Sequence, residues 1–578
     1  MSAPAEHGPP ERFNFARFLI ERNASRAARI AYRDDAGELT YGELHERIAR
    51  FGAALAGLGV RREERVLLLM HDCVDWPVAF LGALHAGVVP VAVNTLLGAG
   101  DYAYMIAHSR AQAVVAGAAL LDTVRAALAH GPHEVRAVVV GGPGAPTPAA
   151  AAGVPADAAG VPADAGAAQP VGAARPTVPE QALAALIESA RPAAAADTGA
   201  DDIAFWLYSS GSTGRPKAAV HAHASPWWTG ELYARPMLAL AERDVVFSAA
   251  KLFFAYGLGN ALTFPLMAGA TTVLMAERPT PAAVFRRLTQ ARPTVFCGVP
   301  TLYAGMLASD GLPARGDVAL RVCTSAGEAL PREVGERFAE RFGCEILDGI
   351  GSTEMLHIYL SNRPGAIRYG TTGQPVPGYE IELRDEAGRP VGAGQIGDLY
   401  VKGPSAALLY WGSRDKSRAT FQGEWLRSGD KYSFDADGYY TYAGRSDDML
   451  KVSGQYVSPF EVEAALARHD SVLEAAVIGV PDAQGLTRTM AFVVVKPGRQ
   501  AGDALAEELQ RLVKASLAPH KYPRRLEFLP ELPKTATGKI QRFRLRELHG
   551  ALPDAQASVA ADATTPVAAD ATAAASAG

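Results

Sequence analysis

A segment rich in glycine and hydroxyl residues, Tyr208-Ser-Ser-Gly-Ser-Thr-Gly-Arg-Pro-Lys217, has the residue types needed to hold phosphate groups. Glycines let backbone N–H groups approach an anion closely, while hydroxyls and a lysine add donors and charge. The segment follows an apolar run at 203–207 that is typical of a strand. It is not a Walker A loop, because Arg215 and Pro216 stand where that motif would begin its helix. We predict a phosphate-binding loop rather than an ordinary Gly/Ser surface loop, formed by Ser209, Ser210, Gly211, Ser212, Thr213, Gly214 and Lys217.

A second motif, Asp348-Gly-Ile-Gly-Ser-Thr-Glu354, places one carboxylate after a glycine-rich turn. Mg²⁺ is commonly held by one or two carboxylates together with phosphate oxygens and water. One glutamate, Glu354, would therefore be chemically sufficient to hold such an ion beside a nucleotide. Taken alone, the same residues could instead form a helix N-terminus with an acidic first turn. The phosphate loop at 209–217 favours the metal interpretation.

The elements that must position these motifs are alternating helices and strands. The segment 39–51 carries Thr40 and, three residues later, Glu43, which is the spacing of a capping box ahead of an amphipathic helix. The apolar block 65–70 suits a buried strand. Because strands alternate with helices up to about Val140, we predict an α/β fold with mostly parallel sheets.

The length of 578 residues exceeds what one hydrophobic core usually supports, so at least two domains are expected. Short strands and turns at 394–441 indicate a small β subdomain, and a helix start at 457 followed by a strand at 490–495 indicates a compact α+β domain. We predict an N-terminal domain at 1–444, a C-terminal domain at 445–548 and a disordered tail at 549–578.

A stretch at 141–195 is rich in Ala, Pro and Gly, and the heptapeptide Ala-Gly-Val-Pro-Ala-Asp-Ala occurs in tandem at 152–158 and 159–165. Repeated Pro and Gly oppose a continuous helix, and few large apolar residues are present to join a core. We predict that 141–195 is a flexible surface insertion without a catalytic role, and that the tail has none either.

The overall charge and composition favour small-molecule chemistry. The formal net charge is -5 and no long Lys/Arg run occurs, so binding to nucleic acid or to an anionic membrane is not expected. The four cysteines, Cys73, Cys297, Cys323 and Cys344, form no CxxC pair, which argues against zinc and disulfides. The start of the chain does not resemble a signal peptide, and no apolar run reaches about 18 residues. A cytoplasmic protein, monomeric or a homodimer, is expected.

Together and in this order, the motifs resemble the adenylate-forming enzymes, a superfamily that includes acyl-CoA synthetases, nonribosomal peptide adenylation domains and firefly luciferase. The resemblance runs from about Phe13 to Leu548, apart from the Ala-rich insertion. One departure is Ala218, where family members usually carry glycine after the lysine. The resemblance implies a large N-terminal domain of several subdomains, a smaller mobile C-terminal domain, and the use of ATP with Mg²⁺.

The resemblance assigns nucleotide roles to residues in several segments. Glu354 would hold Mg²⁺, and Thr353 would face the α-phosphate as part of the catalytic set. The segment 324–330 would lie against adenine. Asp430 would bind the ribose hydroxyls and Arg445 the ribose or a phosphate, although a buried Asp–Arg pair is also commonly structural. The nucleotide contacts implied in this way are Ser325, Ala326, Gly327, Glu328, Asp348, Gly349, Ile350, Gly351, Asp430 and Arg445.

The segment 444–459 matches the family's link between domains. Asp447 corresponds to the hinge residue about which the C-terminal domain turns between two half-reactions. Gly454 matches the glycine beside the tunnel for the pantetheine arm of coenzyme A, and Lys451 is a candidate contact for its phosphates. The alternative, an ordinary linker with a β-turn, would explain the glycines but not the surrounding motifs.

The last motif, Leu532-Pro-Lys-Thr-Ala-Thr-Gly-Lys-Ile-Gln-Arg542, contains the residue that matches the family's catalytic lysine, Lys539. A positive charge near the carboxylate and the α-phosphate would offset the charge that develops during displacement of pyrophosphate. Lys534 is expected to face solvent.

The acid to be activated is indicated by Ala250-Lys-Leu-Phe-Phe-Ala-Tyr-Gly-Leu-Gly-Asn260, in the region that forms the acyl pocket in this family. Aromatic rings could stack on a flat substrate and small residues leave room for it. Together with 354–359 and 520–525, this segment looks most like the benzoate–CoA ligase branch. The expected pocket residues are Phe254, Ala255, Tyr256, Gly257, Gly327, Ile350 and His357, although some rings, and His357, could simply belong to the core.

We therefore expect an ATP-dependent ligase that converts benzoate, or a substituted benzoate, and coenzyme A to the thioester through an acyl-adenylate. Alternatives are an adenylation enzyme that loads a carrier protein in trans, a luciferase-type oxygenase, and a nucleotide-binding protein without turnover. The set Lys217, Glu354, Asp430 and Lys539 argues against the last.

Overall fold

The computed structural model describes residues 7–146, 178–209, 215–446, 448–452, 455–482, 486–518, 520–534 and 540–551. The chain divides into two compact units. The large unit comprises Met1–Ser428 and Ser433–Tyr442, and the small unit comprises Gly429–Tyr432 and Ala443–Gly578. The predicted boundary at Gly444 stays a prediction. The first three residues of the predicted disordered tail, 549–551, belong to the last helix, α17 (Arg542–Ala551), and residues 552–578 lie outside the described residues.

The predicted phosphate loop connects two strands of a sheet in the large unit. The strand order is β19-β9-β8-β4-β3-β5-β6-β7. Neighbours from β8 to β7 are parallel, whereas β9 is antiparallel to β8 and β19 is antiparallel to β9. The strands are β3 (Arg65–Leu69), β4 (Val89–Ala92), β5 (Ala111–Gly117), β6 (Ala137–Gly141), β7 (Glu180–Ala182), β8 (Ile203–Ser209), β9 (Lys217–Ala222) and β19 (Leu409–Tyr410).

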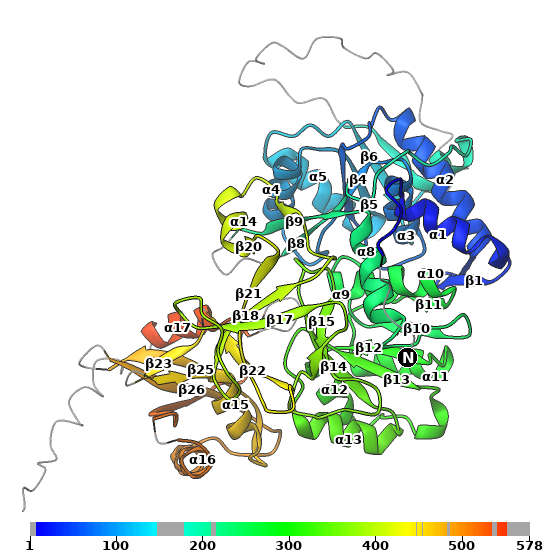
Figure 1. The fold of residues 1–578 in the computed structure, drawn as a ribbon. Helices are drawn as coiled ribbons and strands as arrows, with labels where there is room; N and C mark the ends of the chain where they lie inside the picture. The colour runs from blue at the N-terminus through cyan, green and yellow to red at the C-terminus, as the bar shows by residue number, and fades with distance from the viewer. Residues whose placement is uncertain are drawn as a thin grey trace, which may run out of the picture. The chain divides into compact units, whose positions relative to one another are not determined.

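Helices cover both faces of this sheet, which explains the continuous apolar runs of its central strands. Val66 and Leu68 join a core with the first three helices, while Leu67 and Leu69 face the opposite core with the next two. Figure 1 shows the two groups on opposite sides of the strands. They are α1 (Phe15–Arg22), α2 (Tyr41–Gly57) and α3 (Asp75–His85) on one face, and α4 (Ala99–Ser109) and α5 (Leu121–His130) on the other.

The predicted capping box at the start of α2 is present. The Glu43 amide donates to the Thr40 hydroxyl at 3.2 Å, and the Thr40 amide donates to the Glu43 carboxylate at 2.8 Å. Two otherwise unpaired backbone donors at the helix start are satisfied in this way.

The predicted insertion is too long at its C-terminal end. Residues 180–189 form β7, which pairs with β6, and α7 (Leu183–Ser189), which packs on α2. Leu183 and Ile187 are buried, because they lie four residues apart on one helix face and together anchor a short helix. Of the predicted insertion, residues 147–177 lie outside the described residues.

A second, mostly parallel sheet carries the other motifs of the large unit. Its order is β16-β15-β14-β13-β12-β10-β11-β1-β2, with antiparallel strands at both ends. The strands are β1 (Ile30–Arg33), β2 (Glu38–Thr40), β10 (Val245–Ser248), β11 (Thr271–Val273), β12 (Val295–Gly298), β13 (Val322–Ser325), β14 (Ile346–Gly351), β15 (Ile358–Ser361) and β16 (Gln374–Pro375).

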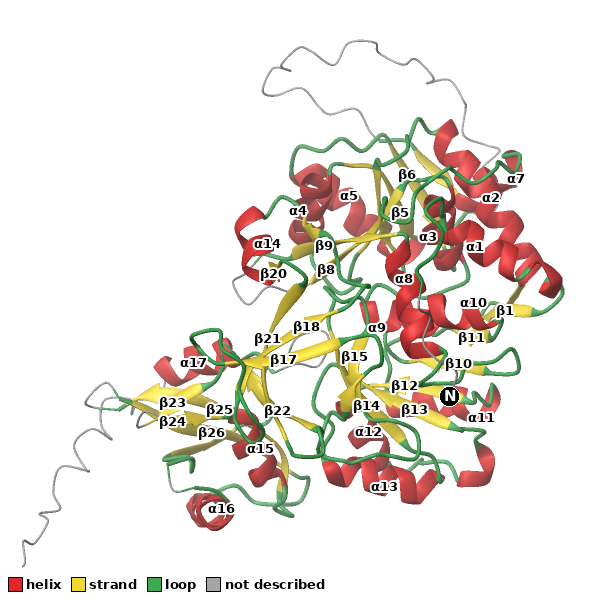
Figure 2. Ribbon diagram, viewed as in Figure 1, coloured by secondary structure: helices red, strands yellow, loops and turns green. Residues whose placement is uncertain are grey.

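Helices also pack on this second sheet (Figure 2). Phe247, Phe296 and Ile346 form a core with the helices α11 (Pro281–Gln290), α12 (Pro300–Leu307) and α13 (Arg332–Phe342). Elsewhere in the large unit are α8 (Ala224–Thr229), α9 (Ala255–Leu258), α10 (Phe264–Ala268), the π-helical turns Gly230–Ala234 and Gly259–Thr263, and the 3₁₀ turns Ala24–Arg26, Ala118–Leu120 and Arg315–Asp317.

A smaller antiparallel sheet, ordered β17-β18-β21-β20 with β22 paired to β21, confirms the predicted β subdomain. Its elements are β17 (Glu380–Arg384), β18 (Gly397–Lys402), α14 (Arg414–Thr420), β20 (Phe421–Gln422), β21 (Trp425–Phe434) and β22 (Tyr440–Arg445).

The small unit is an α+β structure, as predicted. Ser458 caps its first helix by accepting from the Glu461 amide at 3.1 Å, and Pro459 occupies the first turn, where its missing N–H costs nothing. Its elements are the hairpin β23 (Leu450–Val452) and β24 (Gln455–Val457), α15 (Pro459–Ala467), β25 (Val472–Pro481), β26 (Thr487–Val495), α16 (Asp503–Ser516), β27 (Arg525–Phe528) and α17 (Arg542–Ala551). Among the described residues no helix has the length and apolar character needed to cross a membrane.

Candidate active site

The antiparallel pairing of β8 with β9 brings the two ends of the phosphate loop together. Ser209, the last residue of β8, is the register partner of Lys217, the first residue of β9. Five of the predicted phosphate contacts, residues 210–214, lie outside the described residues. The departure at Ala218 is accommodated, because this side chain is buried in the core of the sheet.

The predicted metal ligand Glu354 lies beside this loop. Its carboxylate oxygen Oε1 accepts a hydrogen bond from the Tyr410 hydroxyl at 2.6 Å and a longer one from the Ser209 hydroxyl at 3.4 Å. Lys217 Nζ donates to the same Tyr410 hydroxyl at 3.3 Å. Tyr410 was not found by sequence reasoning, since it lies 56 residues from Glu354 and 193 from Lys217 and belongs to no motif.

The chemistry of this group of side chains fits a magnesium ion that arrives with a nucleotide. In the described parts of the chain no group of three or more His, Cys, Asp or Glu side chains could hold an ion by itself. A single half-buried carboxylate is sufficient for Mg²⁺ only if phosphate oxygens and water complete the coordination. A phosphate loop next to Glu354 would supply those oxygens.

A buried histidine supports the residue before Glu354. His221 Nε2 lies 2.8 Å from the Thr353 carbonyl oxygen, and the ring stacks on Phe205. Burial lowers the pKa of His221 to about 4, so the ring is neutral near pH 7. Because a carbonyl can only accept, Nε2 carries the proton. His221 is a second site residue that the sequence did not reveal.

The parallel strands β13 and β14 bring the predicted adenine segment next to the metal motif, since the carboxyl ends of parallel strands meet at one sheet edge. Ser325, at the end of β13, is the register partner of Asp348 in β14. Asp348 is buried, and burial raises the pKa of its carboxyl to about 8, while the Ser325 hydroxyl opposes this shift. Gly349, Ile350 and Gly351 complete the strand.

The remaining residues of the adenine segment follow β13. Ala326 is buried, and Gly327 is exposed with a φ of +95°, a backbone conformation that favours glycine. Glu328 accepts a hydrogen bond from the Thr301 hydroxyl at 2.7 Å. The predicted contacts of these residues with adenine stay predictions.

Two of the predicted aryl-pocket residues, Tyr256 and His357, belong to an aromatic cluster that also contains Phe264 and Tyr233. The His357 ring lies 5.6 Å from the Tyr256 ring and 4.5 Å from the Phe264 ring, measured between centroids. Tyr233 packs on it from a third side, at 5.2 Å. Burial lowers the pKa of His357 to about 3, which keeps the imidazole neutral.

Glycines make the close packing of this cluster possible. A Cβ atom at Gly259 would lie 2.4 Å from His357 Cδ2, and one at Gly257 would lie 2.0 Å from the Lys251 carbonyl oxygen. Phe254 is half-buried and Ala255 is buried at the start of α9. The Tyr256 hydroxyl lies 2.5 Å from the Thr324 hydroxyl, so this phenol already has a protein partner.

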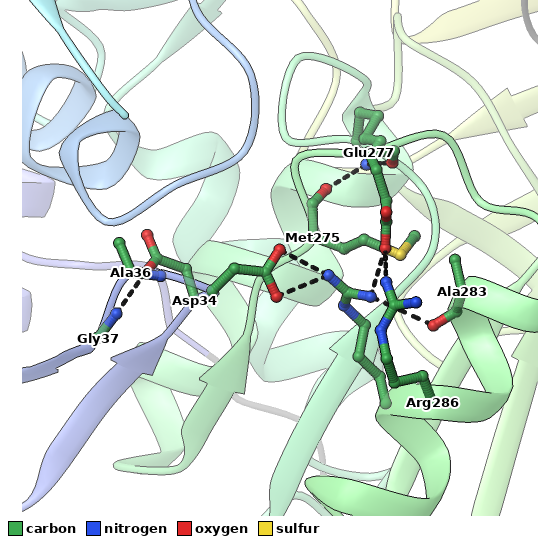
Figure 3. A network of polar contacts seen from close by, with 10 residues as sticks. Asp34, Ala36, Gly37, Met275, Glu277, Ala283 and Arg286 are labelled. Atoms are coloured by element: carbon green, nitrogen blue, oxygen red, sulfur yellow. Dashed lines mark hydrogen bonds and ion pairs between the residues drawn. The ribbon is translucent and has the colours of Figure 1, made fainter. Parts of the chain in front are cut away.

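The segment before the aryl pocket is anchored by a network of charged groups (Figure 3). Lys251 Nζ donates to the backbone carbonyls of Met275 and Glu277, the latter at 2.8 Å. The Glu277 carboxylate pairs with Arg286 and Arg287. Arg287, 6% exposed, in turn binds both oxygens of Asp35 at 2.7 and 2.8 Å, which ties α11 to the turn after β1. Such a network holds Lys251, and hence the start of the pocket segment, in one place.

In the small unit, Asp430 and Arg445 form an ion pair, with Arg445 Nη1 at 2.9 Å from Asp430 Oδ1. Asp430 is buried and Arg445 is exposed. This contact is compatible with ribose binding and with a purely structural role. Asp447, Gly454 and Lys539 lie outside the described residues, as does the side chain of Lys451.

The residues on both sides of the segment that carries Lys539 are described, and they are hydrogen-bonded to each other. Lys534 and Ile540 form an antiparallel bridge, and the Gln541 amide donates to the Pro533 carbonyl at 2.8 Å. The expected solvent-facing role of Lys534 is wrong: its ammonium lies 2.5 Å from the Glu474 carboxylate, and the side chain is only 30% exposed. An acidic residue on β25 attracts the lysine onto the small unit.

The four cysteines lie far apart in the sequence. All four are free and buried. Cys323 and Cys344 approach each other in the tertiary structure, with their sulfur atoms 3.6 Å apart, but they are not bonded.

Comparison with known proteins agrees with this geometry. The chain matches the AMP-binding enzyme family over residues 19–411 and the AMP-binding enzyme C-terminal domain over residues 461–539. The chain therefore belongs to the AMP-binding enzyme family, the adenylate-forming enzymes.

Within this family the chain falls in the benzoate–CoA ligase group. It is 54% identical over 542 residues to a benzoate–CoA ligase of Thauera aromatica, covering 93% of this chain and 96% of the relative. It is 46% identical over 548 residues to a 4-hydroxybenzoate–CoA/benzoate–CoA ligase of Rhodopseudomonas palustris, covering 93% and 95%. A crystal structure of a benzoate CoA ligase from Burkholderia xenovorans LB400 has 60% identity and a TM-score of 0.82, covering 92% and 100%.

Proposed function

We propose that this enzyme activates benzoate or a close aryl relative with ATP and transfers the acyl group to coenzyme A, releasing AMP and diphosphate. The observation that carries the proposal is the 54% identity, along 93% of the chain, to a protein named as a benzoate–CoA ligase. The aromatic cluster around His357 supports an aryl substrate, because flat rings pack well between aromatic side chains.

In the first half-reaction the carboxylate oxygen of the acid attacks the α-phosphorus of ATP, and diphosphate leaves. Lys217 and the loop 209–214 would hold the triphosphate, with Thr353 beside the α-phosphate. Glu354 would bind Mg²⁺, which when bound offsets the negative charge of the phosphate oxygens. Lys539 would place a positive charge between the acid and the α-phosphate, where charge develops in the transition state.

The nucleoside would be held by the residues at the ends of β13 and β14 and by the Asp430–Arg445 pair. Asp348, mostly neutral near pH 7 because its pKa is about 8, would face the nucleotide as a carboxylic acid. The segment 325–328 would lie along the adenine ring.

In the second half-reaction the thiol of coenzyme A attacks the acyl-adenylate and expels AMP. The small unit would turn about Asp447, which would withdraw Lys539 and bring Gly454 beside the pantetheine arm. Lys451 would contact a phosphate of coenzyme A. The same active site would thus serve two reactions in turn.

The aryl ring would lie among Phe254, Ala255, Tyr256, Gly257, Gly327, Ile350 and His357. Since the Tyr256 hydroxyl bonds to Thr324, His357 becomes the preferred partner for a 4-hydroxyl group on the ring. Its neutral imidazole could donate to or accept from such a hydroxyl.

An assay of AMP release with a panel of acids, with and without coenzyme A, tests the proposal. We expect benzoate to exceed acetate and palmitate in kcat/KM, and AMP turnover to require coenzyme A. A preference for palmitate would contradict the aryl assignment. Turnover that requires an acyl carrier protein instead of coenzyme A would favour the carrier-loading alternative.

A further inference from the structure

One phenol lies between the two charged residues of the nucleotide site. The Tyr410 hydroxyl donates to Glu354 Oε1 at 2.6 Å and accepts from Lys217 Nζ at 3.3 Å. A hydroxyl can accept and donate at the same time, so both contacts are satisfied together. Lys217 Nζ also lies 4.4 Å from the centre of the Tyr410 ring, within the range of a cation–π contact.

The backbone around Tyr410 fixes the phenol in this position. Tyr410 pairs with Ala219 across β19 and β9, and the Trp411 amide donates to the Ala218 carbonyl at 2.9 Å. Three residues earlier, the Ala407 amide donates to the carbonyl of Glu354 at 2.7 Å. The segment 407–411 is therefore bonded through its main chain to both motifs, and its buried tyrosine, 3% exposed, has little freedom to move.

We propose that Tyr410 is a positioning residue that keeps Lys217 and Glu354 from forming a direct ion pair. An ammonium and a carboxylate in direct contact would neutralise each other, and they would have to separate before binding phosphate and Mg²⁺. The phenol satisfies both charges while holding them apart. In the described residues both hydrogen bonds of the Glu354 carboxylate go to Oε1, which leaves Oε2 for the metal.

This inference rests on the proposed function, because it assumes that Lys217 meets phosphate and Glu354 meets Mg²⁺. The role proposed for Tyr410 affects the free energy of binding Mg²⁺ with the nucleotide and does not depend on which acid is activated.

The variant Tyr410→Phe tests the inference, since it removes the hydroxyl and keeps the ring. The measurement is the Mg²⁺ affinity in the presence of a non-hydrolysable ATP analogue, adenosine 5′-(α,β-methylene)triphosphate, by titration calorimetry. We expect binding about tenfold weaker, the size of effect typical for loss of a charge-assisted hydrogen bond. An unchanged affinity would overturn the proposal.

A matched control is Tyr41→Phe. The Tyr41 hydroxyl is also buried and donates to the Ala270 carbonyl at 2.7 Å, but it lies in α2 and bonds to neither Lys217 nor Glu354. This variant should bind Mg²⁺ and the analogue as the wild type does. An equal loss in both tyrosine variants would show a general packing effect and would overturn the proposal.

A double-mutant cycle distinguishes two roles of the Tyr410 hydroxyl: keeping Lys217 and Glu354 apart, or only donating a hydrogen bond to Glu354. In a Lys217→Met background no ion pair can form, so adding Tyr410→Phe should weaken Mg²⁺ binding by a smaller factor than it does alone. Equal factors in the two backgrounds would contradict a spacing role.

The two proposals can fail separately. If the wild type releases no AMP with any aryl acid, the proposed function fails. The calorimetric comparison of wild type and Tyr410→Phe uses no acid, so it still decides the role of Tyr410. If AMP release is normal and Tyr410→Phe binds Mg²⁺ unchanged, only the positioning role fails.

Discussion

At the scale of single residues, burial sets the protonation of the groups around the candidate site. His221 and His357 are neutral because their rings are buried, with pKa values of about 4 and about 3. Asp348 is buried too, and the same desolvation keeps its carboxyl protonated up to about pH 8. These three buried groups are therefore mainly uncharged near pH 7.

The raised pKa of Asp348 predicts a pH-dependent stability. In the folded protein the carboxyl ionises near pH 8, whereas the ordinary value is 3.8, so the folded state binds more protons between these values. Its contribution to stability is therefore complete below about pH 4 and decreases as the pH rises to about 8. Compared with Asp348→Asn, the wild type should lose thermal stability over that range, as measured by the midpoints of unfolding. A difference between the two proteins that does not change with pH would contradict this assignment.

A second residue-scale prediction concerns Gly259. In Gly259→Ala the new methyl would meet His357 Cδ2 at 2.4 Å, so the histidine ring must shift. Overpacking of this kind typically costs about 1–3 kcal/mol. We expect the KM for benzoate to rise about tenfold, while the KM for ATP changes little.

A matched glycine serves as a control for this variant. Gly100 in α4 has open space where its Cβ would lie, so Gly100→Ala should leave both KM values unchanged. If Gly259→Ala raised the KM for ATP as much as that for benzoate, His357 would not belong to the aryl pocket.

At the scale of elements, one buried carboxylate connects three elements of the small unit. Glu463 in α15 accepts from the Val477 amide of β25 at 2.7 Å and from Arg542 of α17 at 2.6 Å. Arg542 follows the segment that carries Lys539, whose other flank is held by the Lys534–Glu474 pair. Side chains outside the catalytic segment therefore fix where that segment begins and ends.

Two glutamates on α15 allow this anchoring to be measured. Glu463→Gln keeps a hydrogen-bond acceptor but removes the charge opposite Arg542, and we expect a loss of about 2–3 kcal/mol, since breaking a buried pair is costly. Glu461→Gln, whose carboxylate is 39% exposed and pairs with Lys521, should cost about 0.5 kcal/mol or less. Chemical denaturation of the two variants gives both values. A similar loss of unfolding free energy in both variants would show that Glu463 contributes no more to stability than the exposed Glu461.

At the scale of the whole molecule, the proposed mechanism divides the work between two units. The large unit carries the phosphate loop, Glu354 and the aromatic cluster, while the small unit carries Lys539 and the residues proposed for coenzyme A. A division of this kind predicts that the two half-reactions can be separated by mutation.

Lys539→Ala should therefore lower ATP–pyrophosphate exchange about 100-fold or more, because it removes a charge that stabilises the transition state of adenylation. Thioester formation from supplied benzoyl-adenylate should be spared. Lys496→Ala, which removes an exposed lysine of the same unit, should affect neither activity. Equal loss of both activities in Lys539→Ala would contradict a separate role for Lys539 in adenylation.

The sequence by itself determined the features that depend on local rules. The capping box of α2 and the apolar block of β3 could be predicted because their signals lie within a few residues, and the order of the motifs indicated the family. The prediction of a flexible insertion was wrong at 180–189. The composition there resembled a linker, but one leucine and one isoleucine side chain, Leu183 and Ile187, anchor α7.

Only the tertiary structure decided which distant residues meet. Tyr410 reaches Lys217, 193 residues earlier, because β19 pairs with β9 at the edge of the sheet. His221 likewise reaches Thr353, 132 residues later in the chain. The ion pair between Lys534 and Glu474 likewise joins residues that are distant in the sequence. Long-range pairing of this kind has no local pattern, because its free energy comes from contacts that exist only once the chain has folded.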